Sequence, residues 1–197
     1  VSLKTRAKTS YNTAVLFGET DNGSYNLSAS ISRYYVNSSD RPRVLALKNT
    51  LNEYAIHSPH YQYSSSFGDK NSQIVNLISI PSIMYGSKIK KGSISLKYYV
   101  SGSLVGELQD KNYNGELIQV GPEGSTGSGS VAGVCLYREG FMLLTGSWNL
   151  DSNSIETDAT GPSKWIHFNY GANDGNSIGT TTVSASFAME YKGTTHT

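Results

Sequence analysis

The pattern that most suggests chemistry is a run of oxygen-bearing side chains at alternate positions, Asp110, Asn112 and Asn114, which ends at Gly115. Calcium loops of the EF type begin this way, because alternate side-chain oxygens converge on one cation where the chain bends at glycine. The twelfth position, however, holds Gly121 instead of a bidentate glutamate, and a lysine inside the loop adds positive charge. Two interpretations remain, a Ca²⁺ site or an Asn-Gly hairpin turn, and these departures favour the turn.

Three further sets of reactive side chains are too sparse to predict a catalytic or metal centre. His57 and His60 form a close pair in a proline-broken loop, but a zinc site needs at least a third ligand. Glu107 and Glu116 could face each other as in a glycosidase, yet both lie beside turn residues and are better interpreted as surface carboxylates. Cys135 sits in an apolar run that suits a buried thiol. Because nucleophile-elbow, phosphate-loop and dinucleotide fingerprints are also absent, we expect a non-enzymatic protein without a cofactor.

Aromatic residues offer another kind of chemistry, recognition through ring faces. The chain has 14 tyrosines and two tryptophans. Exposed rings would form either a platform for sugars or a protein interface, where tyrosine supplies contact area and a hydrogen bond at small entropic cost. The low charge of the chain favours the interface. The candidate contact residues are Tyr98, Tyr99, Tyr113, Trp148 and Trp165.

Composition limits the class of protein. The formal net charge of +1 is too small for an electrostatic nucleic-acid surface, and the local excess at Lys88, Lys90 and Lys91 is minor. No run approaches the roughly 20 apolar residues that span a bilayer, so we expect neither nucleic acid nor membrane as a partner. Only 16% of residues are charged, which is typical of hydroxyl-rich β surfaces of secreted or virion proteins. The Val1 start predicts a processed chain or a piece of a longer polypeptide.

These side chains must be positioned by strands, because apolar residues recur with period two. In residues 93–100, Ile94, Leu96, Tyr98 and Val100 share one face, while residues 74–80 are almost continuously apolar, as in a strand buried on both faces. We expect an all-β antiparallel sandwich or barrel-like fold of about nine strands in a single domain over residues 1–197. Further strands are predicted near residues 25–36, 103–109, 116–120, 131–137, 141–148, 164–170 and 183–191.

Three segments depart from this strand pattern. Residues 39–54 predict one short helix with an apolar stripe, and the alternative is a strand over residues 43–47. Residues 1–12 are polar and basic without periodicity, which predicts an N-terminal arm. Residues 121–130, rich in glycine and serine, predict a loop; a linker between two domains is the alternative, but the hairpin that follows carries too little core to stand alone.

The amino-acid sequence of the C-terminal part resembles that of a virion structural protein of large marine tailed phages, including those of cyanobacteria. Residues 80–90 read IPSIMYGSKIK, residues 106–122 read GELQDKNYNGELIQVGP and residues 124–134 read GSTGSGSVAGV. The likeness also includes residues 95–100, 137–148, 171–175 and 186–189. It is strongest over residues 80–190 and does not extend to the first 70 residues.

The resemblance implies a place in the tail, baseplate or fibre region of the particle and brings no catalytic residue. It implies that the partners are other copies of the chain and other virion proteins, and that the chain is located in the virion after assembly in the host cytoplasm. Short strands, many turns and low charge agree with a protein selected for assembly by surface complementarity. The alternatives are a carbohydrate-binding receptor module, which would bind a host surface glycan, and a capsid decoration protein.

Overall fold

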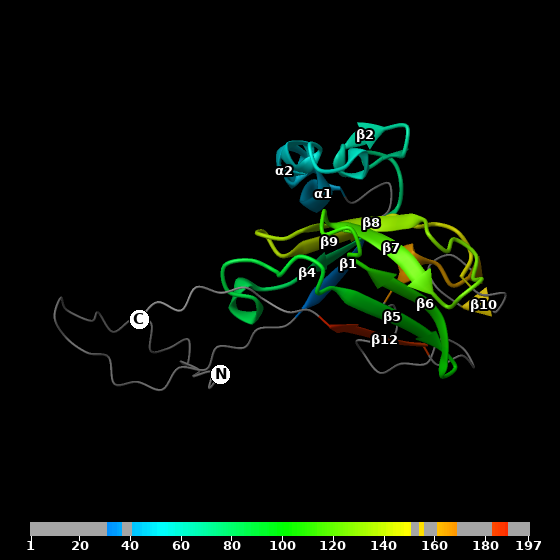
Figure 1. The fold of residues 1–197 in the computed structure, drawn as a ribbon. Coiled ribbons are helices and arrows are strands. Elements are labelled where there is room, and N and C mark those ends of the chain that lie inside the picture. The colour runs from blue at the N-terminus through cyan, green and yellow to red at the C-terminus, as the bar shows by residue number, and fades with distance from the viewer. Residues whose placement is uncertain (1–30, 37–40, 151–153, 156–160, 169–182, 189–197) are drawn as a thin grey trace, which may run out of the picture. The chain divides into compact units, whose positions relative to one another are not determined.

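The computed structural model describes residues 31–36, 41–150, 154–155, 161–168 and 183–188. Within them an eight-stranded antiparallel sheet dominates and curls into a half-barrel (Figure 1). The predicted all-β, barrel-like fold is therefore confirmed. In sheet order the strands are β1 (Ser32–Val36), β4 (Val75–Ser79), β9 (Phe141–Leu144), β8 (Val131–Leu136), β7 (Glu116–Gly121), β6 (Ser103–Gln109), β5 (Ser95–Val100) and β12 (Val183–Ala188). The predicted arm at residues 1–12 lies outside the described residues.

Most of the sheet is a simple meander. Strands β5 to β9 follow one another in space as they do in sequence, while β4 and β1 extend the sheet beyond β9, and β12 pairs with β5 at the other end. Two small two-stranded sheets accompany it, β2 (Ser64–Ser65) with β3 (Gly68–Asp69) and β10 (Ser154–Ile155) with β11 (Gly161–Pro162). The segment that enters β5 lies beside the start of the β8–β9 turn. The Ile89 N–H donates to the Tyr137 carbonyl there, at 2.9 Å.

The period-two alternation of the sequence becomes the core of the half-barrel. In β5 the predicted inward residues Leu96, Tyr98 and Val100 are buried, and Ile94 just before the strand is buried with them. Strand β4 is buried from Val75 to Ile78, as its continuous apolar run predicts. Alternating side chains leave a strand on opposite faces, so β4 contributes Ile78 to one core cluster and Val75 to another.

The two core clusters lie on opposite faces of the β4–β9–β8 region. The first contains Met142 and Leu144 of β9 together with most of the buried residues of β5 and β6. The second contains Leu143 of β9 and the buried residues of the helical segment, which covers this face of the sheet near β8 and β9 (Figure 1). Burial on both faces explains why these strands carry consecutive apolar residues.

The helix predicted over residues 39–54 is present as two consecutive segments, α1 (Pro42–Ala46) and α2 (Lys48–Tyr54). Val44 and Leu51 are fully buried beneath them, and the N–H of Leu47 between the segments bonds the Val44 carbonyl at 3.1 Å. The alternative of a strand over residues 43–47 is wrong. A 3₁₀ turn, η2 (Pro59–Tyr61), follows and is capped by Ser58, whose hydroxyl accepts the His60 N–H at 3.1 Å.

The strand predicted over residues 164–170 is wrong for residues 164–168, where the chain forms the 3₁₀ turn η4 (Trp165–His167); residues 169–170 lie outside the described residues. Trp165, Ile166 and His167 are all buried, which no alternating strand with a wet face allows. Hydrogen bonds from side chains replace the ladder, since Tyr98 Oη donates to the His167 carbonyl and Asn76 Nδ2 to the Phe168 carbonyl, at 3.2 and 2.7 Å. A third 3₁₀ turn, η3 (Ser82–Met84), precedes β5.

Candidate functional site

The turn between β6 and β7, residues 110–116, holds the predicted calcium ligands and is here named the Asp110 turn. Asp110 is only 1% exposed. Its Oδ2 accepts the Gly92 N–H at 2.8 Å and the Tyr137 hydroxyl, and its Oδ1 accepts the Gly115 N–H at 3.1 Å. One buried carboxylate thus joins the turn, the loop before β5 and the end of β8. A cation at this position would have to displace three hydrogen-bond donors.

The two asparagines of the pattern also bond within the protein. Asn114 Oδ1 accepts the Glu116 N–H at 3.1 Å, and Asn112 Nδ2 donates to Glu116 Oε2 at 3.2 Å. Gly115 has φ +91°, and a Cβ there would collide with the Tyr61 hydroxyl, which donates to the Cys135 carbonyl. In the part of the chain that the structure describes, no group of three or more His, Cys, Asp or Glu side chains is arranged to hold a metal ion.

Two of the five aromatic contact candidates are core residues, which corrects their assignment to a surface. Tyr98 and Trp165 are both 0% exposed, and their ring centroids lie 6.1 Å apart. Neither ring can meet a partner in this fold, because the curl of the sheet and η4 enclose both. Tyr99 and Trp148 are half-buried, and Tyr113 is exposed at the tip of the Asp110 turn.

Both tryptophans are held by one buried glutamine. Gln119 Oε1 accepts the indole N–H groups of Trp148 and Trp165, at 2.8 and 2.9 Å. Its Nε2 donates to Ser125 Oγ and to the Thr126 carbonyl, at 2.9 and 2.8 Å. Gln119 therefore ties η4 and the Gly/Ser loop to β7, and this loop folds back on the sheet.

The remaining sequence candidates are separate in space or occupied. Glu107 lies opposite Gly121 in the β6–β7 register, whereas Glu116 pairs with β8, so the two carboxylates do not oppose each other. Cys135 is fully buried, which raises the pKa of its thiol well above its usual value. The ring of His60 packs on Phe67 at 4.3 Å between centroids, and burial lowers the pKa of His60.

The buried Lys70 ammonium, like the buried Asp110 carboxylate, forms hydrogen bonds that fix the backbone of a loop. Lys70 is 4% exposed, and its Nζ donates to the carbonyls of His60 and Gln62, at 2.8 and 2.7 Å. Burial lowers the pKa of Lys70 to about 8. Arg41 holds the same loop through Nη1, which donates to the Lys70 carbonyl at 2.9 Å. The loop between α2 and β4 is therefore fixed by charged side chains.

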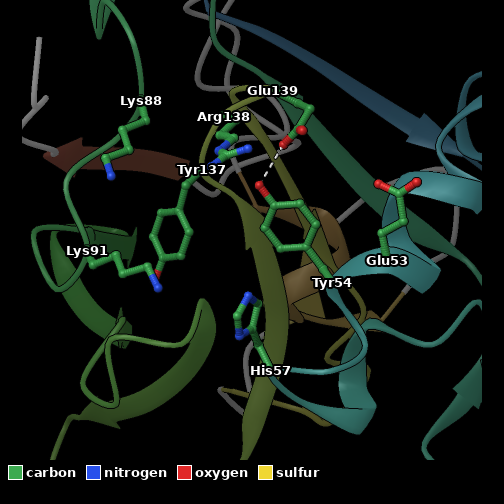
Figure 2. Close-up of a pocket in the computed structure, with 8 residues that line it drawn as sticks. All are labelled: Glu53, Tyr54, His57, Lys88, Lys91, Tyr137, Arg138 and Glu139. Atoms are coloured by element: carbon green, nitrogen blue, oxygen red, sulfur yellow. Dashed lines mark hydrogen bonds between the residues drawn. The ribbon is translucent and has the colours of Figure 1, made fainter. Parts of the chain in front are cut away.

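A cleft that no local motif predicts lies between α2, the segment before β5 and the β8–β9 turn. It has a volume of about 350 Å³, within the range of small-ligand sites, and we name it the Tyr54 cleft. Figure 2 shows its lining residues converging from these three segments. They are Glu53, Tyr54, His57, Lys88, Lys91, Tyr137, Arg138 and Glu139.

Hydrogen bonds to the sheet hold the floor of the cleft. Tyr54 Oη donates to Glu139 Oε2 at 2.9 Å, and burial together with the Glu139 carboxylate raises the pKa of Tyr54 to about 12. The Tyr137 ring is buried and its hydroxyl bonds Asp110, which links the cleft to the Asp110 turn. Tyr85 Oη donates to the Arg138 carbonyl at 3.1 Å and holds the backbone of the β8–β9 turn.

Cations line one side of the cleft. Figure 2 shows Lys88 and Lys91 on a different side of the Tyr137 ring from Tyr54. Lys91 Nζ lies 5.5 Å from the Tyr137 ring centroid, within the range of a cation–π contact. The sequence signals for this cleft are weak: a small lysine excess near residue 90, a lone histidine and a turn sequence. Three segments far apart in sequence supply them, so only the fold brings them together.

Comparison of the chain with protein-family models, with curated proteins and with solved structures finds no match. Among the described residues, no helix combines the length and apolar composition needed to cross a bilayer.

Proposed function

We propose that this chain is a non-catalytic structural component of a tailed phage particle, in the tail, baseplate or fibre region, and that it acts by protein–protein assembly. The resemblance of residues 80–190 to virion proteins motivates the proposal. The all-β fold and the low charge of the chain agree with a rigid building block. Its partners would be other copies of itself and other virion proteins, and a capsid-surface position is the less favoured location.

The observation that carries the proposal is the bonding of Asp110. An acid that works in catalysis must reach a substrate, whereas both oxygens of this buried carboxylate receive donors from three separate segments. Gln119 likewise joins separate segments, because it accepts from Trp148 and Trp165, whereas Lys70 bonds two carbonyls within its own loop. Polar groups that fix loops onto a sheet favour a rigid scaffold over an enzyme.

Surfaces for assembly are available on this scaffold. Among the described strands, β1 and β12 each have a single neighbour, and edge strands present backbone groups that a partner strand can bond. Tyr113 is 63% exposed at the tip of the rigid Asp110 turn, and tyrosine is enriched at protein interfaces.

The test uses phage particles whose genome encodes this sequence. Mass spectrometry of purified particles is expected to detect the chain at a fixed copy number, and a cryo-EM map is expected to contain the eight-stranded half-barrel in the tail, baseplate or fibre. Expression of the chain during infection together with its absence from purified particles would contradict the proposal.

A carbohydrate-binding receptor module is the second candidate function, favoured by the Tyr54 cleft. The cleft combines tyrosine rings with charged and polar side chains in a volume of about 350 Å³. A glycan array probed with the isolated chain separates the two functions, because assembly alone does not require sugar binding.

A further inference from the structure

Among the described residues, no carboxylate forms an ion pair with the cations of the Tyr54 cleft. These cations are Lys88, Lys91 and Arg138. Cations gathered on one part of a concave surface attract ions of opposite sign to that part. The cationic side of the cleft therefore suits a ligand with an anionic group.

The two acidic groups of the cleft lie apart from Lys88 and Lys91 (Figure 2). The Glu139 carboxylate already accepts the Tyr54 hydroxyl at 2.9 Å, and it belongs to the floor. Glu53 is exposed and lies on α2, away from the two lysines (Figure 2). A bound ligand thus meets Lys88 and Lys91 on one side and Glu53 on the other, with His57 as a further polar group of the lining (Figure 2).

The size and lining of the cleft indicate the body of the ligand. A volume of about 350 Å³ accommodates one or two sugar rings, and the half-buried Tyr54 ring provides apolar surface. An extended peptide instead favours a strand edge or a long groove, and the three-sided lining of this cleft provides neither. Hydroxyl groups around a ring match polar side chains on several sides better than a linear chain does.

We propose that the Tyr54 cleft binds an acidic saccharide unit, whose carboxylate or sulfate contacts Lys88, Lys91 and Arg138 and whose hydroxyls face Glu53 and His57. Arginine and lysine recognise both oxyanions through charge-assisted hydrogen bonds. The inference deepens the carbohydrate-binding candidate and is independent of the virion role, which is tested on particles and not by sugar binding.

The test measures binding of four probes to the full chain by calorimetry at low and moderate salt. The probes are digalacturonate, a sulfated digalactose, unsubstituted digalactose and a tetraglutamate peptide. We expect at least one acidic sugar to bind about tenfold more tightly than unsubstituted digalactose, and to weaken as salt increases. The two acidic sugars distinguish carboxylate from sulfate as the bound group.

The variant pair Lys88→Ala/Lys91→Ala is expected to weaken acidic-sugar binding about tenfold or more. The matched control is Lys90→Ala/Lys111→Ala, which removes the same charge from two exposed lysines outside the cleft lining and is expected to change affinity less than twofold. Equal loss in both pairs, equal binding of the neutral sugar, tighter binding of the peptide or no binding of either acidic sugar would overturn the proposal. Thermal melting of each variant verifies that it is folded.

Discussion

The Asp110 turn and the Tyr54 cleft share Tyr137 but use polar side chains in opposite ways. In the turn, a buried carboxylate has its donors supplied by the protein itself. In the cleft, Lys88 and Arg138 line an open volume without a carboxylate partner among the described residues. A local pattern that resembles a metal loop is thus structural here, whereas the groups available for a ligand come from segments without a motif.

The largest loss of stability is expected at Asp110. Asp110→Ala leaves two backbone N–H groups and the Tyr137 hydroxyl without their acceptor in a buried place, and should lower the free energy of unfolding by about 3–5 kcal/mol. Urea denaturation measures the change. Asn112→Ala, which removes one exposed hydrogen bond from the same turn, is the control and should cost less than about 1 kcal/mol. Similar losses of unfolding free energy in the two variants would show that the hydrogen bonds of Asp110 do not stabilise the fold more than an exposed bond does.

The buried Lys70 is expected to make the free energy of unfolding depend on pH. Unfolded Lys70 keeps its proton up to its ordinary pKa of 10.5, whereas in the folded protein burial lowers the pKa to about 8. Between these values the unfolded state binds more protons, so the contribution of Lys70 to stability rises with pH, on the order of 2 kcal/mol across the window. Denaturation from pH 7 to pH 10 should show a flatter rise for Lys70→Met than for the wild type. Lys48→Met, at an exposed lysine, should keep the wild-type slope.

The next largest loss of stability is expected at Tyr137, which belongs to both the Asp110 turn and the Tyr54 cleft. Tyr137→Phe removes one of the three donors to Asp110 and leaves the two backbone donors in place, so the expected loss is about 1–2 kcal/mol. Differential scanning calorimetry of this variant beside Asp110→Ala tests whether the hydroxyl and the two backbone donors share the stabilisation. A loss of stability as large as that of Asp110→Ala would mean that the hydroxyl alone provides it.

The smallest stability effect is expected inside the cleft. Tyr54→Phe removes the half-buried hydrogen bond to Glu139 and should cost about 0.5–1 kcal/mol at neutral pH. Folding raises the pKa of Tyr54 to about 12, so its contribution is present below pH 10 and is lost as pH rises toward 12. A double-mutant cycle with Glu139→Gln isolates the pair. A cost above that of Tyr137→Phe would contradict the view that the cleft is less important for stability than the Asp110 turn.

The sequence predicted the strands that alternate clearly. The prediction failed at η4, where side-chain hydrogen bonds take the place of backbone bonds between strands. The face of Ile94, Leu96, Tyr98 and Val100 is buried as predicted, because period two allows only one face to meet the core. Trp165 alternates with its neighbours as in a strand, yet it forms a 3₁₀ turn whose indole bonds Gln119. That partner lies 46 positions away, beyond the reach of any local pattern.

Composition and periodicity were enough to predict an all-β chain of low charge, a helical segment over residues 39–54 and a turn at Asp110, since these follow from local geometry and from which face must avoid water. Only the tertiary structure decided that Tyr98 and Trp165 are core residues and that Asp110 bonds Gly92 and Tyr137. It also brought Tyr54, Lys88 and Arg138 to one cleft. The physical reason is that burial and charge compensation depend on neighbours distant in sequence, which the curl of the sheet brings together.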